Sequence, residues 1–178
     1  MLKSYSYLFT AFLFIILFSD KIIAQSEIAN LRTEYLVNPI GLDIPTPRFT
    51  WSIDSKKKGY LQESFQIKVA SSPELLKKGE ADIWKSKKIK SSRSFIKYIG
   101  DIKLKSHSKY YWQVKVWERK GKAILSSIST FETAKIYNDD WKAEWISDDF
   151  SKEFRKSPMF RKDFYLGKKV KQARAYVS

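Results

Sequence analysis

Residues 109–117 read KYYWQVKVW, and apolar side chains alternate there with polar or amphipathic ones more regularly than elsewhere in the chain. This period of two predicts a central β-strand, because successive side chains of a strand project to opposite faces of the sheet. The face that we expect to fill a core carries Tyr110, Trp112, Val114 and Val116. The opposite face carries Tyr111, Gln113, Lys115 and Trp117. This pattern predicts a scaffold and by itself indicates no activity.

Shorter segments with strand character lie on both sides of this strand, and turn-forming residues separate them. They span residues 31–36, 48–54, 62–71, 83–86, 94–99 and 126–133. Residues 48–54 place Phe49, Trp51 and Ile53 on one face, whereas residues 72–79 fit a short capped helical connector. About seven short strands within residues 28–134 predict an all-β fold, an antiparallel β-sandwich.

Residues 104–110 (LKSHSKY) and the strand that follows resemble the sixth strand of a fibronectin type III domain. In that fold a tyrosine at the start of the strand bonds back to the preceding turn, and the matching residue is Tyr110. The resemblance implies a fibronectin type III-like sandwich over residues 28–134. We expect structural roles for Tyr110, Trp112 and Trp51.

The composition excludes several kinds of chemistry. The 178 residues include 34 Lys and Arg against 19 Asp and Glu, a net charge of +15, but the lysines are spread along the chain and form no nucleic-acid-binding motif. The absence of cysteine excludes disulfides and thiolate chemistry, and a lone histidine leaves no plausible zinc site. Six scattered glycines form no phosphate-binding motif. We therefore predict no metal, no cofactor and no nucleic-acid partner.

Residues 1–24 have the pattern of an export signal. Lys3 precedes an apolar run over residues 8–18, and the small Ala24 precedes the polar Gln25. The apolar run is shorter than the roughly 20 residues that a membrane-spanning helix needs. We expect cleavage after Ala24, no stable membrane anchor afterwards, and a periplasmic or extracellular location.

The pattern changes after residue 134. Residues 135–146 are acidic and aromatic without a period of two, which indicates a connector. Residues 147–178 contain two strand-like segments, 158–166 and 170–178, which we expect to begin a second β-sandwich domain. Because two strands alone are marginal in water, we expect this second domain to be incomplete.

Candidate catalytic groups are few. The carboxylates of the connector region are Asp139, Asp140, Glu144, Asp148 and Asp149. A glycosidase needs two carboxylates about 5–9.5 Å apart, one of them with a raised pKa, whereas carboxylates in a polar connector remain solvated. His107 is expected to be a turn residue, because no G-x-S-x-G motif accompanies it. We predict no catalytic residue in this chain.

Tyr111 and Trp117 are the candidate ligand or interface aromatics. An aromatic side chain exposed on a sheet can stack on a sugar ring, and it can equally pack against a neighbouring domain. We expect the neighbouring domain.

Several motifs follow one another in order along the chain. They are LxxEYLxNPxGLDxPxPRFxW at residues 31–51, QIxVASS at 66–72, DIWxS at 82–86, YYWxVxVW at 110–117, WxAxWI at 141–146, PMFRKxF at 158–164 and VKxARAY at 170–176. This ordered set resembles the N-terminal region of secreted bacterial α-L-rhamnosidases of glycoside hydrolase family 78. The resemblance covers nearly all of the chain after the export signal.

The resemblance implies an exported multidomain enzyme that removes terminal α-linked rhamnose with inversion, using two carboxylates of an (α/α)₆ barrel. No position of this chain matches the barrel motifs. We therefore expect a fragment that is truncated before the barrel and inactive alone, whose partners are the remaining domains of the parent enzyme. The alternative is a secreted carbohydrate-binding or adhesion module that stands alone and uses Tyr111 and Trp117.

Overall fold

The computed structural model describes residues 26–119, 121–137, 142–144, 146, 159–170 and 173–175. The predicted export signal, residues 1–24, lies outside the described residues. The chain divides into two compact units, Met1–Trp141 and Lys142–Ser178. The described strands and the helix belong to the first unit.

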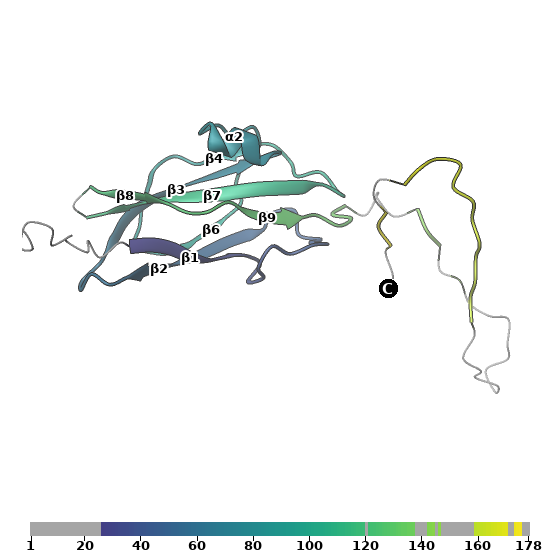
Figure 1. Cartoon of the computed structure of the whole chain (residues 1–178), viewed down its shortest axis with the longest axis horizontal. Coiled ribbons are helices and arrows are strands. Elements are labelled where there is room, and N and C mark those ends of the chain that lie inside the picture. Colours follow the sequence, from purple (N-terminus) through teal and green to yellow (C-terminus); the bar gives the residue numbers. More distant parts are fainter. Residues whose placement is uncertain are drawn as a thin grey trace, which may run out of the picture. The chain divides into compact units, whose positions relative to one another are not determined.

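Two antiparallel sheets pack face to face in the first unit (Figure 1). One sheet has the order β1-β2-β6, formed by β1 (Ser26–Thr33), β2 (Arg48–Ser55) and β6 (Phe95–Lys97). The other has six strands in the order β4-β3-β7-β8, with β5 paired to β3 and β9 paired to β7. Its strands are β3 (Gln62–Ala70), β4 (Trp84–Lys85), β5 (Ile89–Lys90), β7 (Lys109–Glu118), β8 (Ala123–Leu125) and β9 (Ser129–Glu132). This arrangement confirms the predicted antiparallel β-sandwich.

Strand β7 lies at the centre of the larger sheet, between β3 on one side and β8 and β9 on the other. Its side chains alternate as the sequence predicts. Trp112, Val114 and Val116 are completely buried, whereas Tyr111 and Trp117 on the other face are partly exposed. The β3 residues that pair with this strand place Phe65 and Ile67 in the same core.

The facing sheet contributes aromatic rings to this core. The ring centroids of Phe49 and Trp112 lie 4.9 Å apart across the two sheets, and those of Trp51 and Phe65 also lie 4.9 Å apart. Full burial of such side chains stabilises a fold by about 1.5–3 kcal/mol each relative to exposure. The alternation of β2, β3 and β7 therefore supplies large side chains to the packing between the layers.

The helix α2 (Pro73–Lys77) connects β3 to β4 and packs on the outside of the larger sheet (Figure 1). Ser72 accepts a hydrogen bond from the backbone of Leu75 and caps the first turn, and Pro73 occupies the first turn as the sequence predicts. Gly79 follows with φ of 81°, a conformation in which glycine has no steric penalty. Leu76 is the residue that the helix buries.

Three elements differ from the sequence-based prediction. Strand β1 covers Ser26–Thr33, earlier than the predicted 31–36, because the chain reverses in a tight turn after Thr33. The short strands β5 and β8 were not predicted, since segments of two and three residues show too little alternation to be recognised.

The two strands predicted at 158–166 and 170–178 fall only partly within the described residues. The described residues in these ranges, 159–170 and 173–175, form no strand and are exposed to solvent. Apolar side chains such as Met159 (93% exposed) and Tyr165 (98%) have no described sheet to pack on. Because a strand pair alone is marginal in water, the start of a second β-domain in this region stays a prediction that requires partner strands.

Candidate functional site

A tight turn follows β1, and the residues of the first family-like motif build it. Thr33 and Leu36 exchange backbone hydrogen bonds of 2.9 and 3.0 Å, while Glu34 and Tyr35 between them have positive φ angles of 50° and 64°. This left-handed backbone normally favours Asn or Gly, so side-chain contacts must hold the turn in place.

Arg48 supplies those contacts. Its Nη2 donates to Glu34 Oε2 at 2.6 Å, its Nε donates to the same oxygen at 3.0 Å, and its backbone N–H donates to Oε1 at 2.6 Å. The guanidinium also lies 4.8 Å from the ring centroid of Tyr35. Burial alone would raise the pKa of Glu34, but the hydrogen bonds and charge of Arg48 outweigh it and keep that pKa below its usual range. Glu34 is therefore an ionised structural group.

The rest of the loop between β1 and β2 is fastened to the last strand. Asn38 Oδ1 accepts hydrogen bonds from Ser129 Oγ at 2.8 Å and from the Thr130 backbone at 2.9 Å. Leu42 donates through its backbone to Glu132 at 2.9 Å and accepts from Ala134 at 2.6 Å. Residues of the family-like motif thus close the sandwich between its first and last strands.

Tyr110 forms a tyrosine corner. Its hydroxyl accepts a hydrogen bond of 2.7 Å from the backbone N–H of Lys105, and its ring stacks on Phe131 with the centroids 5.2 Å apart. Nearby, the Tyr98 hydroxyl donates to the carbonyl of Ile102 at 2.5 Å, and burial raises the pKa of Tyr98 to about 12. Both tyrosines hold the segment that precedes β7.

The tryptophans Trp51 and Trp112 lie in the core, at 5% and 0% exposure. Trp51 donates from Nε1 to Gln62 Oε1 at 3.1 Å, which satisfies its polar atom inside the sandwich. Neither tryptophan offers a surface to a ligand.

The outer aromatics Tyr111 and Trp117 lie on the exposed face of the larger sheet. The Lys109 ammonium lies 6.0 Å from the Tyr111 ring centroid, while those of Lys88 and Lys115 lie 4.4 and 5.3 Å from the Trp117 ring centroid. Cations at these distances are attracted to the ring faces. The structure thus places Trp117 in a basic environment and separates it from Tyr111 by two outer positions of the strand.

The candidate acid–base groups form no catalytic arrangement within the described residues. Asp139, Asp140, Asp148 and Asp149 lie outside them, and Glu144 is exposed. His107 is an exposed turn residue with φ of 56°, and its backbone N–H donates to the carbonyl of Ala134 at 3.1 Å. In the ranges that the structure describes, acidic side chains and histidine form no group of three that could hold a metal ion.

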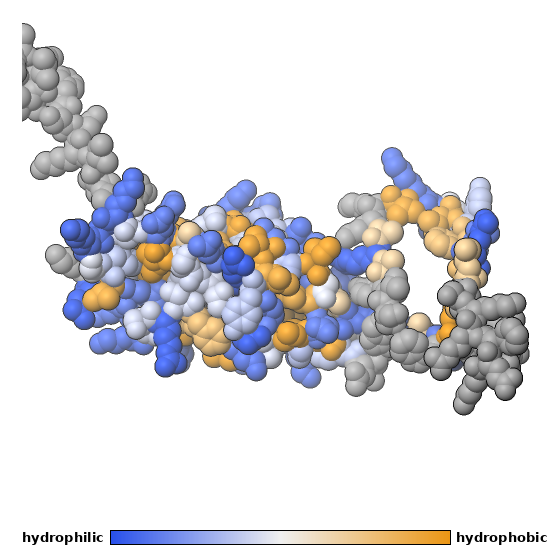
Figure 2. Space-filling model, turned by 90° about the horizontal axis from the view of Figure 1, so that it is seen from below, coloured by the Kyte–Doolittle hydropathy of each residue, from blue (hydrophilic) through white to orange (hydrophobic). Residues whose placement is uncertain are grey.

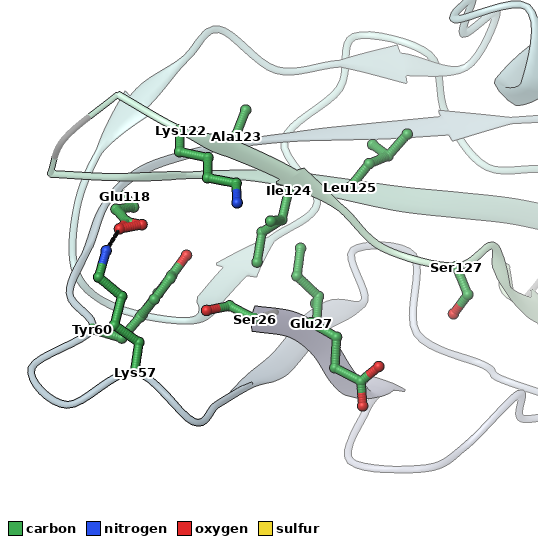
Figure 3. Close-up of a pocket in the computed structure, with 11 residues that line it drawn as sticks. Ser26, Glu27, Lys57, Tyr60, Glu118, Lys122, Ala123, Ile124, Leu125 and Ser127 are labelled. Carbon is green, nitrogen blue, oxygen red and sulfur yellow. Dashed lines mark hydrogen bonds and ion pairs between the residues drawn. The ribbon is translucent and has the colours of Figure 1, made fainter. Parts of the chain in front are cut away.

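A groove that the sequence analysis did not predict lies between β1 and β8 (Figure 3). It has a volume of about 1020 Å³, and its polar residues include Lys57, Tyr60, Glu118 and Lys122. Lys57 forms an ion pair with Glu118, which is 9% exposed, and the Tyr60 hydroxyl is buried without a hydrogen-bond partner. Burial, followed by the charge of Glu118, raises the pKa of Tyr60. A glutamate at the end of an alternating strand looks solvated in sequence, so this pair had no recognisable signal.

Exposed apolar residues gather in the loop after β1. Leu36, Val37 and Ile40 are 55%, 61% and 79% exposed. Figure 2 views the molecule from the side of the three-stranded sheet and shows hydrophobic residues among hydrophilic ones on that face. Within the part of the chain that the structure describes, no helix has the length and hydrophobicity needed to span a membrane.

The two antiparallel sheets and the tyrosine corner define an immunoglobulin-like or fibronectin-like β-sandwich. The buried charges of this sandwich have structural roles. Residues 28–137 match the family described as Rha78A-like, N-terminal immunoglobulin domain, and the chain belongs to this family. The family is the N-terminal region of α-L-rhamnosidases.

Relatives of known name agree with this assignment. The chain is 34% identical over 189 residues to an α-L-rhamnosidase of Formosa agariphila, an alignment that covers 99% of this chain and 20% of the relative. The α-L-rhamnosidase structure from Dictyoglumus thermophilum superimposes with a TM-score of 0.65 at 33% identity, over 69% of this chain and 14% of the other. That of the Streptomyces avermitilis enzyme complexed with L-rhamnose gives 0.64 at 35% identity, over 69% and 12%. The chain therefore spans about a fifth or less of the length of these relatives.

Proposed function

We propose that this chain is a non-catalytic accessory region of an exported α-L-rhamnosidase, and that it serves as a scaffold for the other domains of the enzyme. The observation that carries this proposal is the role of the residues that give the family resemblance. Glu34, Arg48, Asn38 and Leu42 all make hydrogen bonds that hold the sandwich together.

The placement of the buried carboxylates supports a role without catalysis. Arg48, the cation that binds Glu34, is the first residue of β2, and Lys57, the cation that binds Glu118, follows the last residue of that strand. Eight residues of strand span roughly 26 Å at about 3.3 Å per residue, whereas a glycosidase pair lies within about 10 Å. Each carboxylate also has its own cation, Arg48 or Lys57. These two groups do not flank a common bond.

The exposed apolar loop supports a role in domain packing. Leu36, Val37 and Ile40 lie close in sequence on a loop whose backbone is fixed by β9, so their exposure is maintained by the fold. Apolar surface held in this way commonly marks a contact with another domain. The parent enzyme is the source of that domain in this proposal.

The test is an activity assay on the purified full chain with an aryl α-L-rhamnoside. We expect no release above the uncatalysed rate, while the full-length Formosa agariphila relative serves as the positive control. Turnover that survives repurification and disappears on substituting Glu34 or Glu118 would overturn the proposal.

A stand-alone carbohydrate-binding module is the second candidate, and the partly exposed Trp117 ring is the observation that favours it. Binding of the full chain to a neutral glycan array, reduced by Trp117→Ala or Tyr111→Ala, is expected for this candidate. The scaffold proposal expects no such binding.

A further inference from the structure

The outer face of the larger sheet brings lysines together in adjacent rows. Cross-strand register places Lys85 opposite Lys68, and Lys68 opposite Gln113. The next row pairs Gln66 with Lys115, and the one after it pairs Lys90 with Ser64 and Ser64 with Trp117. These residues alternate with the buried Ile67, Val69, Val114 and Val116, so their side chains share the outer face of the sheet, on which Ser64 is buried and the lysines reach solvent.

This arrangement places like charges against one another. Two lysines directly opposite on neighbouring strands destabilise a sheet, and Lys68 and Lys85 are such a pair. Burial lowers the pKa of Lys68, and the charges of Lys85 and Lys115 lower it further. One hydrogen of the Lys68 ammonium is donated to the carbonyl of Gly79 at 2.5 Å. An ammonium has three donors, so two remain for another group.

Trp117 lies beside these cations. Lys88 and Lys115 place their ammonium groups 4.4 and 5.3 Å from the centroid of its ring. The paired outer positions from Ala70 to Ser64 and from Tyr111 to Trp117 include no carboxylate. Because these two ammonium groups lie over the indole ring, an acidic substituent that they bind would be held close to Trp117, and the ring in turn holds the two cations in place.

We propose that this lysine face, formed by Lys68, Lys85, Lys88, Lys90, Lys115 and Trp117, binds an anionic polysaccharide. Charge complementarity identifies the partner as a polyanion, because its acidic groups would relieve the repulsion between Lys68, Lys85 and Lys115. All the cations of the face are lysines, which act as point charges and lack the planar fork with which arginine recognises phosphate. The choice of a glycan among polyanions rests on the proposed function.

The test measures binding of the full chain to alginate, a carboxylated polysaccharide, by calorimetry at low ionic strength. The variant Lys68→Gln/Lys85→Gln/Lys115→Gln removes three charges from the face. The control variant Lys56→Gln/Lys58→Gln/Lys103→Gln removes three charges from exposed loop positions elsewhere. We expect the first variant to weaken binding at least tenfold and the control less than twofold, with Trp117→Ala weakening it severalfold.

Thermal unfolding shows whether a loss of alginate binding reflects a loss of folded protein. Because the first variant removes the Lys68–Lys85 repulsion, its melting temperature should be unchanged or higher. Absence of alginate binding, or equal losses in the two triple variants, would overturn the proposal. So would equally tight binding of single-stranded DNA with no effect of Trp117→Ala. Any of these results leaves the accessory role in a rhamnosidase intact, because the rhamnoside assay tests that role separately.

Discussion

At the scale of single residues, Arg48 determines how the chain turns after its first strand. Glu34 and Tyr35 both adopt left-handed backbone, which costs roughly 1–2 kcal/mol for each residue with a Cβ. Arg48 offsets this cost by binding the Glu34 carboxylate through two nitrogens and by lying over the Tyr35 ring. The contact with Arg48 explains why Glu34 is found at a left-handed position that asparagine or glycine would adopt more easily.

The variant Glu34→Gln is expected to lower the free energy of unfolding by about 1 kcal/mol at pH 7, a figure discounted for the solvent exposure of Arg48. Because the folded pKa of Glu34 is lowered, its contribution is present above the ordinary glutamate pKa of about 4.3 and is lost as the pH falls through the folded value. Urea denaturation followed by tryptophan fluorescence at pH 7 and at pH 3 measures both effects.

Glu80→Gln is the matched control, since it removes a carboxylate from an exposed loop position. We expect it to change stability by less than 0.5 kcal/mol, as is usual for surface substitutions. A difference between wild type and Glu34→Gln that stayed constant from pH 7 to pH 3 would contradict the ion-pair explanation.

At the scale of elements, β7 has the position and facing that its sequence predicts. A strand of ten residues with both faces specified leaves a single register that buries Trp112, Val114 and Val116. Strands β2 and β3 were predictable for the same reason. Strands β5 and β8 were not, because two or three residues cannot display a period, and their existence depends on the long strands they pair with.

The candidate site was predictable to a smaller extent. Alternation alone placed Tyr111 and Trp117 on the outer face, but the lysines that surround Trp117 come from β7 and from the segment between β4 and β5. Which residues meet across strands depends on register, and register depends on packing that a single sequence does not display. The strand pattern of residues 158–178 stays a prediction for a related reason, since periodicity describes a face without supplying a partner for it.

Tyr110→Phe tests how β7 is attached to the segment before it. Loss of the hydroxyl leaves the backbone N–H of Lys105 without its acceptor, which we expect to lower the free energy of unfolding by about 1–2 kcal/mol. Tyr111→Phe, at the neighbouring outer position, is the control and should have an effect below 0.5 kcal/mol. Equal destabilisation by the two variants in urea denaturation would argue against the tyrosine corner as a structural device.

At the scale of the whole molecule, the chain combines a closed sandwich with predicted export. Expression of the full chain in a bacterial host is expected to yield an exported product that begins at Gln25, as measured by intact mass and N-terminal sequencing. The small residue at the cleavage site is required by the signal pattern, so Ala24→Lys should block processing while Gln25→Ser should not. A product that retains Met1 in the cytoplasmic fraction would contradict the export proposal.

The loop between β1 and β2 joins the beginning of the sandwich to its end, and this has a consequence for the order of folding. Asn38 bonds to Ser129 and Thr130 across 91 and 92 residues of chain. Folds dominated by such distant pairings have high contact order and form slowly, because loop closure precedes any gain from the contacts. A growing polypeptide cannot complete this sandwich until residues 129–134 have been synthesised, so its first strands must remain open to other interactions until then.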